Sequence, residues 1–303
     1  MNKESKLHPK NIHRHGYNLE ALVAVLPGLK LFLITNKYGN TTIDFANPKA
    51  VKALNIALLY SHYNISSWSF PDSNLCPPIP SRADYIHYLN DILEAFNLQK
   101  EVTVLDIGTG ATCIYPLLGK AIYNWNFIAT DIDKNSLNNA QKIIDANSMQ
   151  KAIKLRFQKQ NKNILKEILL KEEKITATIC NPPFYKNEIE AQQATDRKLL
   201  GLNIKTPNSI RNFSGSANEL WYPGGEKAFL HNYIYESSLF KNNCFWFTSL
   251  VSKKELLRGL KVSLKKLGAT DVKVIAMEQG NKKMRIIAWT FLTIEEQKKW
   301  NTF

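Results

Sequence analysis

Seven stretches rich in apolar residues, separated by turns or helical patterns, dominate the chain from residue 102 onward. Short, mainly apolar stretches are typical of strands that are buried in a parallel sheet. We expect strands at residues 102–107, 125–130, 152–157, 175–180, 243–251, 271–277 and 285–292. Apolar residues at helical spacing predict helices at 114–121, 134–146 and 256–267, and another after Glu226. The alternation of strands and helices predicts an α/β fold.

Before this core, short helices alternate with irregular stretches. Asparagines that precede apolar helical patterns predict one helix at residues 19–26 and another from Pro48 onward. Residues 66–81 are rich in proline and serine, which predicts an extended connection leading to a further helix. We therefore expect two parts, an N-terminal arm with a helical extension at residues 1–81 and a core domain at residues 82–303.

Length and charge narrow the class of protein. The 303 residues suffice for one large domain with an extension. They include 40 Lys and Arg against 26 Asp and Glu, a net charge of +14. An excess of one sign this large favours a polyanion, such as nucleic acid, as the partner. Charge that serves only solubility is the alternative.

Neither membrane nor metal chemistry is indicated. The N-terminus has no apolar segment behind it, and no stretch approaches about 20 uninterrupted apolar residues, so we expect neither secretion nor a membrane span. The four cysteines lie far apart without a Cys-x-x-Cys pair. We therefore expect reduced thiols in a cytoplasmic protein, and no metal site.

The stretch with the most specific chemistry is Asn181, Pro182, Pro183 and Phe184, directly after the apolar run 175–180. Two prolines fix the backbone, so the Asn181 side chain and the Pro182 carbonyl keep one orientation. Amide and carbonyl oxygens accept both hydrogens of a planar amine, and the Phe184 ring stacks on the base that carries it. These four residues are the candidate catalytic group for alkylation of a nucleobase amine. The alternative is a simple turn after a strand.

Two acidic residues and a glycine turn indicate a nucleotide-type cofactor. Gly108 and Gly110 follow the first core strand and let a ligand approach the backbone. Asp131 follows the second strand, where nucleotide-binding α/β folds grip ribose hydroxyls. A dinucleotide site would have glycine in place of Cys113, and Asp106 would repel a pyrophosphate. The Asp106 carboxylate suits the ammonium group of S-adenosylmethionine.

Three further sites are candidates on weaker grounds. Arg82 begins the core after a stiff connection and suits a ligand carboxylate, although a surface role is equally compatible. Gln160 or Asn161, in the polar turn after the third strand, offers contacts to an adenine edge. The basic arm 7–17 suits RNA phosphates, with a solvated tail as the alternative. The long segment 185–225 has little periodicity, which indicates a functional flap or disorder.

In their order along the chain, these motifs resemble a class I methyltransferase, and more closely the ribosomal RNA large-subunit methyltransferase F family. Members are adenine-N6 methyltransferases and bacterial relatives of the eukaryotic U6 small nuclear RNA methyltransferase. The resemblance spans nearly the whole chain. The matching stretches are His8-Pro9-Lys10-Asn11, residues 107–117, Cys180-Asn181-Pro182-Pro183-Phe184, Gly224-Gly225-Glu226, and Gln279-Gly280 with Arg285 and Ala288-Trp289.

The resemblance implies a Rossmann-like, seven-stranded, mostly parallel sheet with an antiparallel last strand. It implies methyl transfer from S-adenosylmethionine to the N6 amine of an adenine in 23S ribosomal RNA, free or in a large-subunit assembly particle, by a monomer. The resemblance implies cofactor contacts at Arg82, Asp106, Gly108, Gly110 and Asp131, and target-base contacts at Asn181, Pro182 and Phe184. Gln160 and Asn181 are further expected cofactor contacts, although many methyltransferases have Asp at the place of Gln160. In the arm we expect RNA contacts at Lys10, His13, Arg14 and His15, although the family arm often carries more arginine.

Three other functions are compatible with parts of the pattern. Asn-Pro-Pro-aromatic motifs also occur in guanine-N2 RNA methyltransferases and in glutamine-N5 methyltransferases of release factors, because all three methylate a planar nitrogen. The basic charge disfavours a protein substrate. An RNA-binding scaffold without activity is disfavoured because the cofactor motif and the amine-binding motif are both intact.

Overall fold

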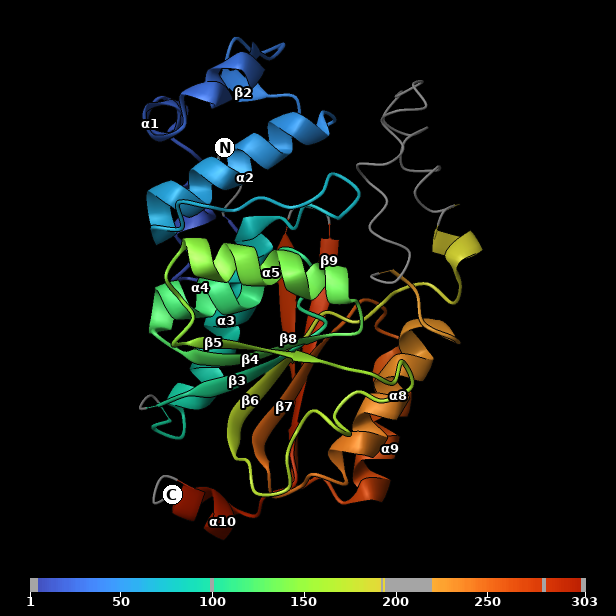
Figure 1. Cartoon of the computed structure of the whole chain (residues 1–303). Coiled ribbons are helices and arrows are strands. Elements are labelled where there is room, and N and C mark those ends of the chain that lie inside the picture. The colour runs from blue at the N-terminus through green and yellow to red at the C-terminus, as the bar shows by residue number, and fades with distance from the viewer. Residues whose placement is uncertain (1–4, 99–100, 192, 194–219, 280–281, 301–303) are drawn as a thin grey trace.

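A seven-stranded sheet forms the centre of the molecule (Figure 1). The structure, a computed structural model, describes residues 5–98, 101–191, 193, 220–279 and 282–300. The strands lie in the order β5-β4-β3-β6-β7-β9-β8. Their bounds are β3 Thr103–Ile107, β4 Asn126–Asp131, β5 Ile153–Phe157, β6 Ile175–Cys180, β7 Cys244–Val251, β8 Asp271–Gln279 and β9 Lys282–Thr290.

Each of the seven predicted core strands corresponds to one of these strands. Neighbours from β5 to β7 pair in parallel, whereas β9 pairs antiparallel with both β7 and β8. The mostly parallel sheet with an antiparallel last strand is therefore confirmed. All six residues of β6 are buried, so its two threonines lie inside the molecule together with its apolar residues.

Helices cover both faces of the sheet. Helices α3 (Ile79–Glu94), α4 (Ile114–Tyr123) and α5 (Lys134–Ala146) lie on one face, and α8 (Gly225–Ser237) and α9 (Leu256–Leu267) lie on the other (Figure 1). Each face has its own apolar core, and the two cores are separated by the sheet. Among the described residues, no helix is both long and apolar enough to span a membrane.

The N-terminal part has a small core of its own. Helix α1 (Leu19–Val25), the 3-10 helix η2 (Pro27–Phe32) and helix α2 (Pro48–Tyr63) pack around buried Leu29 and Leu58. The short hairpin of β1 (Leu33–Thr35) and β2 (Thr41–Ile43) and the C-terminal α10 (Ile294–Lys299) were not predicted.

Hydrogen bonds to residues far along the chain hold the N-terminal arm in place. The sequence indicates an irregular arm, but the arm is not irregular throughout. It contains the 3-10 helix η1 (Ile12–His15). The backbone N–H of His8 donates to Asp84 at 3.0 Å, and the Asn11 amide donates to the Pro80 carbonyl at 2.9 Å. The arm therefore packs along the first turns of α3. The predicted flap at 185–225 lies for its greater part outside the described residues.

Candidate active site

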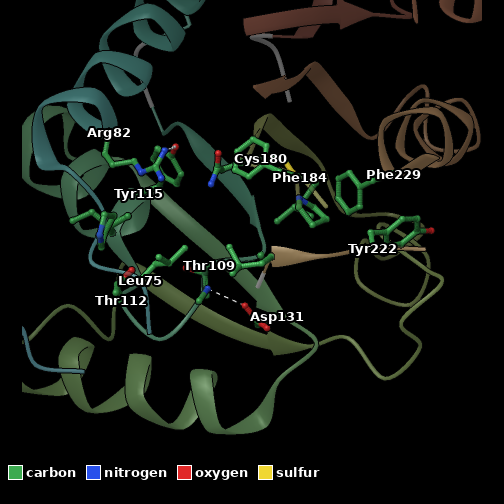
Figure 2. A pocket seen from close by; sticks show the side chains of 18 of the residues that line it. Leu75, Arg82, Thr109, Thr112, Tyr115, Asp131, Cys180, Phe184, Tyr222 and Phe229 are labelled. Atoms are coloured by element: carbon green, nitrogen blue, oxygen red, sulfur yellow. Dashed lines mark hydrogen bonds between the residues drawn. The ribbon is translucent and has the colours of Figure 1, made fainter. Parts of the chain in front are cut away.

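A cavity of about 430 Å³ opens at the carboxyl ends of the parallel strands. This volume is within the usual range for cofactor and substrate sites. Figure 2 shows Arg82 and Tyr115 together on one side and Phe184, Phe229 and Tyr222 on the other. The cavity lies where the parallel sheet brings together the residues that follow β3, β4, β5 and β6.

The turn after β3 leaves room for a ligand. Gly108 and Gly110 have φ values of +76° and +63°, which residues with a side chain rarely adopt. A Cβ added at Gly108, a cavity-lining residue, would meet no other atom within 4 Å. The structure thus shows open space at the position where the sequence predicts close approach of a cofactor.

Asp131 is built into this turn. Its carboxylate accepts hydrogen bonds from the backbone N–H of Gly110 at 2.8 Å and of Asp133 at 2.9 Å. The Asp133 side chain in turn caps α5 by accepting from Asn135 and Ser136. Asp131 is 8% exposed and lines the cavity, and burial raises the pKa of its carboxyl group. The carboxylate therefore both fixes the glycine turn and faces the site.

Asp106 does not itself line the cavity, but Ile107 and Gly108, which follow it, do. Its side chain is 1% exposed, and the Thr109 hydroxyl lies near it, but neither carboxylate oxygen accepts a hydrogen bond of good geometry from the described residues. Burial raises the pKa of this group to about 7. A buried carboxyl group without partners is costly unless a ligand supplies donors or a cation.

This carboxyl group predicts a pH dependence of stability without ligand. Because its pKa is raised from 3.8 to about 7 by folding, the folded state binds more protons than the unfolded state between these values. Wild type should therefore lose stability relative to Asp106→Asn as the pH rises from 4 to 7. Urea unfolding of both proteins at pH 5 and pH 8 measures the difference. An equal gap at both pH values would contradict the raised pKa.

Arg82 reaches the cavity from the first turns of α3. Its guanidinium donates to the Tyr115 hydroxyl at 2.9 Å, while its Nε has no partner among the described residues. Burial raises the pKa of Tyr115 to about 12, so this hydroxyl remains a neutral acceptor. Arg82 therefore keeps donors available for a ligand carboxylate, as the sequence predicts. The role of Tyr115 in holding it was not foreseen, although Tyr115 lies in the stretch 107–117.

The loop after β5 corrects one prediction. Gln160 is exposed and does not line the cavity, and its backbone N–H donates to the Gln158 side chain at 2.9 Å. Gln158 and Asn161 line the cavity instead, together with Asn163. The polar turn is at the site, but sequence alone does not show which of its amides face inward.

The Asn-Pro-Pro-Phe group stands at the carboxyl end of β6. Asn181, Pro183 and Phe184 line the cavity, whereas Pro182 is buried beside it. The Asn181 side-chain oxygen is shielded from solvent and has no hydrogen-bond donor among the described residues. An acceptor left unpaired in this way favours a ligand that brings an N–H group.

An aromatic wall continues from this group. The backbone N–H groups of Phe184 and Tyr185 lie within 3.1 Å of the Leu220 carbonyl, and Tyr222 packs edge-on against Phe229 at 5.3 Å. Tyr222, Phe229 and Trp221 line the cavity. Sequence reasoning missed these residues because they lie about 40 positions beyond the motif, across a segment without periodicity.

The four predicted RNA contacts differ in their surroundings. His13 is 5% exposed and bonded to the Tyr63 hydroxyl at 2.8 Å, and burial lowers its pKa to about 4. A buried neutral imidazole does not suit a phosphate. The Lys10 ammonium lies 3.0 Å from Glu94 in an exposed ion pair. His15 is exposed and Arg14 partly so.

A sheet of this order, with a glycine turn after β3 and the Asn-Pro-Pro-Phe group after β6, defines a class I methyltransferase. Comparison with known proteins makes the class specific. A protein-family model described as "RNA methyltransferase" matches residues 1–293 of the chain. The chain is 49% identical over 307 residues to a protein of Flavobacterium johnsoniae named "Ribosomal RNA large subunit methyltransferase F", covering 98% of this chain and 97% of that protein.

Solved structures agree with this match. The catalytic domain of human METTL16 in complex with MAT2A 3'UTR hairpin 6 has a TM-score of 0.80 at 30% identity, covering 95% of this chain and 98% of that one. The N-terminal domain of human METTL16 in complex with SAH has a TM-score of 0.77 at 28% identity, covering 95% and 99%.

The chain belongs to the RNA methyltransferase family represented by the ribosomal RNA large-subunit methyltransferase F proteins. It is thus an S-adenosylmethionine-dependent enzyme that acts on RNA, which confirms the predicted family, activity class and cofactor.

Proposed function

We propose that the protein methylates the N6 amine of one adenine in large-subunit ribosomal RNA. The observation that supports this most directly is the placement of Asn181 and Phe184 beside the cavity, with an unpaired amide oxygen on Asn181. An exocyclic amine supplies the missing donor, and the aromatic ring supplies stacking for a base removed from its helix.

The residues of the cavity fit S-adenosylmethionine. The open space at Gly108 would let the cofactor lie close to the backbone, and Asp131 would hold the ribose hydroxyls of the cofactor. Asp106 supplies negative charge for the ammonium group, and Arg82 supplies donors for the carboxylate. When bound, the cofactor supplies an electrophilic methyl group.

The chain's own contribution to the reaction is to orient the nucleophile. An adenine amine is a weak nucleophile because its lone pair is delocalised into the ring. Hydrogen bonds from the amine to the Asn181 oxygen and the Pro182 carbonyl would favour a pyramidal nitrogen with its lone pair directed at the methyl group. Phe184 would hold the base plane. Catalysis then rests on positioning and electrostatics, without a strong base.

Mass spectrometry of ribosomal RNA from cells with and without the protein tests this proposal. Loss of one N6-methyladenosine is the expected result. Loss of an N2-methylguanosine would favour the guanine alternative, and a methylated glutamine in a protein would favour the third candidate. The same assay on free RNA and on isolated large-subunit particles identifies the physical form of the substrate.

The proposal extends to the N-terminal part and the cellular setting. Residues 1–81 would form the RNA-binding arm and extension, and residues 82–303 the catalytic domain. We infer that the enzyme acts as a monomer in the cytoplasm, where ribosomal RNA is assembled into particles.

The arm yields a separate prediction for RNA affinity. Each phosphate contact that is lost should reduce the slope of log K against log salt by about 0.7–0.9. We expect the double variant Arg14→Ala/His15→Ala to bind RNA more weakly and with a smaller slope, while its affinity for S-adenosylhomocysteine stays unchanged. Fluorescence anisotropy at several salt concentrations provides the measurement.

The matched control for this prediction is Lys298→Ala. Lys298 is an exposed cation on α10, at the end of the molecule opposite the N-terminal helices (Figure 1). It should leave both affinity and slope unchanged. A double variant that behaves like this control would show that the arm makes no phosphate contact through these residues.

A further inference from the structure

Helix α8 carries a buried carboxylate that the proposed chemistry does not use. Glu236 is 2% exposed, and among the described residues it has no Lys or Arg within ion-pair distance. Its carboxylate accepts hydrogen bonds from three successive backbone N–H groups, those of Ile164 at 3.0 Å, Leu165 at 2.7 Å and Lys166 at 2.9 Å. All three N–H groups donate to Oε2, and that of Ile164 also lies 3.2 Å from Oε1.

These donors belong to the loop that lines one end of the cavity. The loop contributes the inward-facing residues Gln158, Asn161, Asn163 and Ile164. Gln158 is itself tied back to the same turn, since its amide donates to the Lys166 carbonyl at 2.9 Å. Moving residues 164–166 would therefore shift the side chains that line the cavity.

A second residue of α8 holds the same loop one helical turn earlier. The Asn232 amide donates to the Lys162 carbonyl at 2.8 Å and to the Tyr222 hydroxyl at 3.2 Å. Asn232 and Glu236 are four positions apart and so lie on one face of the helix. This face of α8 therefore holds the loop at Lys162 and again at residues 164–166.

Strand order shows which part of the cofactor the loop would contact. β5 is the edge neighbour of β4, so the loop lies beyond Asp131 and on the side away from Asn181, which follows β6. If the cofactor's ribose lies at Asp131 and its reacting methyl group lies near Asn181, the end of the cavity beside this loop is left for the cofactor's nucleobase. This step rests on the proposed function.

We propose that Glu236 is a positioning residue for the cofactor, acting through the loop that lines the nucleobase end of the cavity. Its charge holds three backbone N–H groups in place, and Asn232 supports the same loop. The residue itself contacts neither cofactor nor substrate. It sets cofactor affinity and contributes little to the methyl transfer itself.

Glu236→Gln tests this proposal in the full-length protein. Glutamine keeps the shape but removes the charge, and its NH₂ group replaces either Oε2, which accepts from all three N–H groups, or Oε1, which faces Ile164. In both placements the hydrogen bonds to the loop are weaker, so the loop should shift. We expect S-adenosylhomocysteine to bind about tenfold more weakly by calorimetry. The KM for S-adenosylmethionine should rise by a similar factor, while kcat at saturation stays within about threefold of wild type. RNA affinity without cofactor should not change.

Glu226→Gln is the matched control. Glu226 is also a buried carboxylate on α8, at 4% exposure, but it holds the backbone N–H of Ser252, which does not line the cavity. Both variants should lower the melting temperature, and only Glu236→Gln should weaken cofactor binding. Equal cofactor affinity in the two variants would overturn the proposal.

Asn232→Ala keeps the proposal testable if Glu236→Gln fails to fold. Asn232 is only partly buried, and its loss should weaken S-adenosylhomocysteine binding about threefold in a folded protein. Unchanged binding would count against the role of this helix face. Failure of wild type itself to bind S-adenosylhomocysteine would instead contradict the assignment of the cavity and so the proposed function.

Discussion

Asn181→Ala should lower kcat by at least about 100-fold and leave S-adenosylhomocysteine affinity nearly unchanged. The amide oxygen lies at the end of β6, shielded from solvent and unpaired among the described residues. Its proposed hydrogen bond gains strength as the amine nitrogen becomes pyramidal, so its loss affects the transition state more than the ground state. Although Asn181 also stands among the implied cofactor contacts, the effect on binding should be small.

Single-turnover kinetics with saturating cofactor and RNA would measure this effect. Asn138→Ala serves as the control, because Asn138 is exposed on α5 and does not line the cavity. It should react at the wild-type rate. If Asn181→Ala also reacted near the wild-type rate, the residue would have no part in orienting the amine.

Asp131→Ala should weaken cofactor binding by about 1.5–3 kcal/mol, the scale of a hydrogen bond to a charged group. The structure adds a second reason for a large effect. The same carboxylate accepts from Gly110 and Asp133, so its removal also releases the glycine turn. Calorimetry with S-adenosylhomocysteine provides the measurement, and circular dichroism shows whether the variant is folded.

Asp145→Ala is the control for this prediction. Asp145 lies on α5 and is exposed, and its side chain accepts only from Gln141 among the described residues. The Asp145→Ala variant should bind the cofactor with unchanged affinity. A folded Asp131→Ala protein that binds with wild-type affinity would exclude Asp131 from the cofactor site.

The sheet could be predicted because its central strands are buried on both faces. β6 is buried at all six positions, so the stretch 175–180 contains no charged residue. The β1–β2 hairpin could not be predicted, since its strands have three residues each and are largely exposed. Helix α10 did leave a signal, the capping box from Thr293 to Glu296, which the apolar pattern alone does not reveal.

The site was predictable where a residue is fixed by its neighbours in sequence. Asn181 and Gly108 directly follow strands, so their place at the carboxyl edge follows from the fold. Buried His13 is hydrogen-bonded to Tyr63, 50 residues away, and Gln160 is exposed whereas Gln158, two residues earlier, lines the cavity. Contacts of that kind arise only from the packed structure.

The strand order also determines which edges of the sheet are still uncovered while the chain is being synthesised. β3 pairs with β4 on one side and with β6 on the other, and β6 begins only at residue 175. A nascent chain ending at β5 therefore has the glycine turn and Asp131 in place, yet one edge of β3 is open to pairing with another chain. The segment that closes this edge is the one that delivers Asn181. The Asn-Pro-Pro-Phe group is thus synthesised together with the strand that covers this open edge.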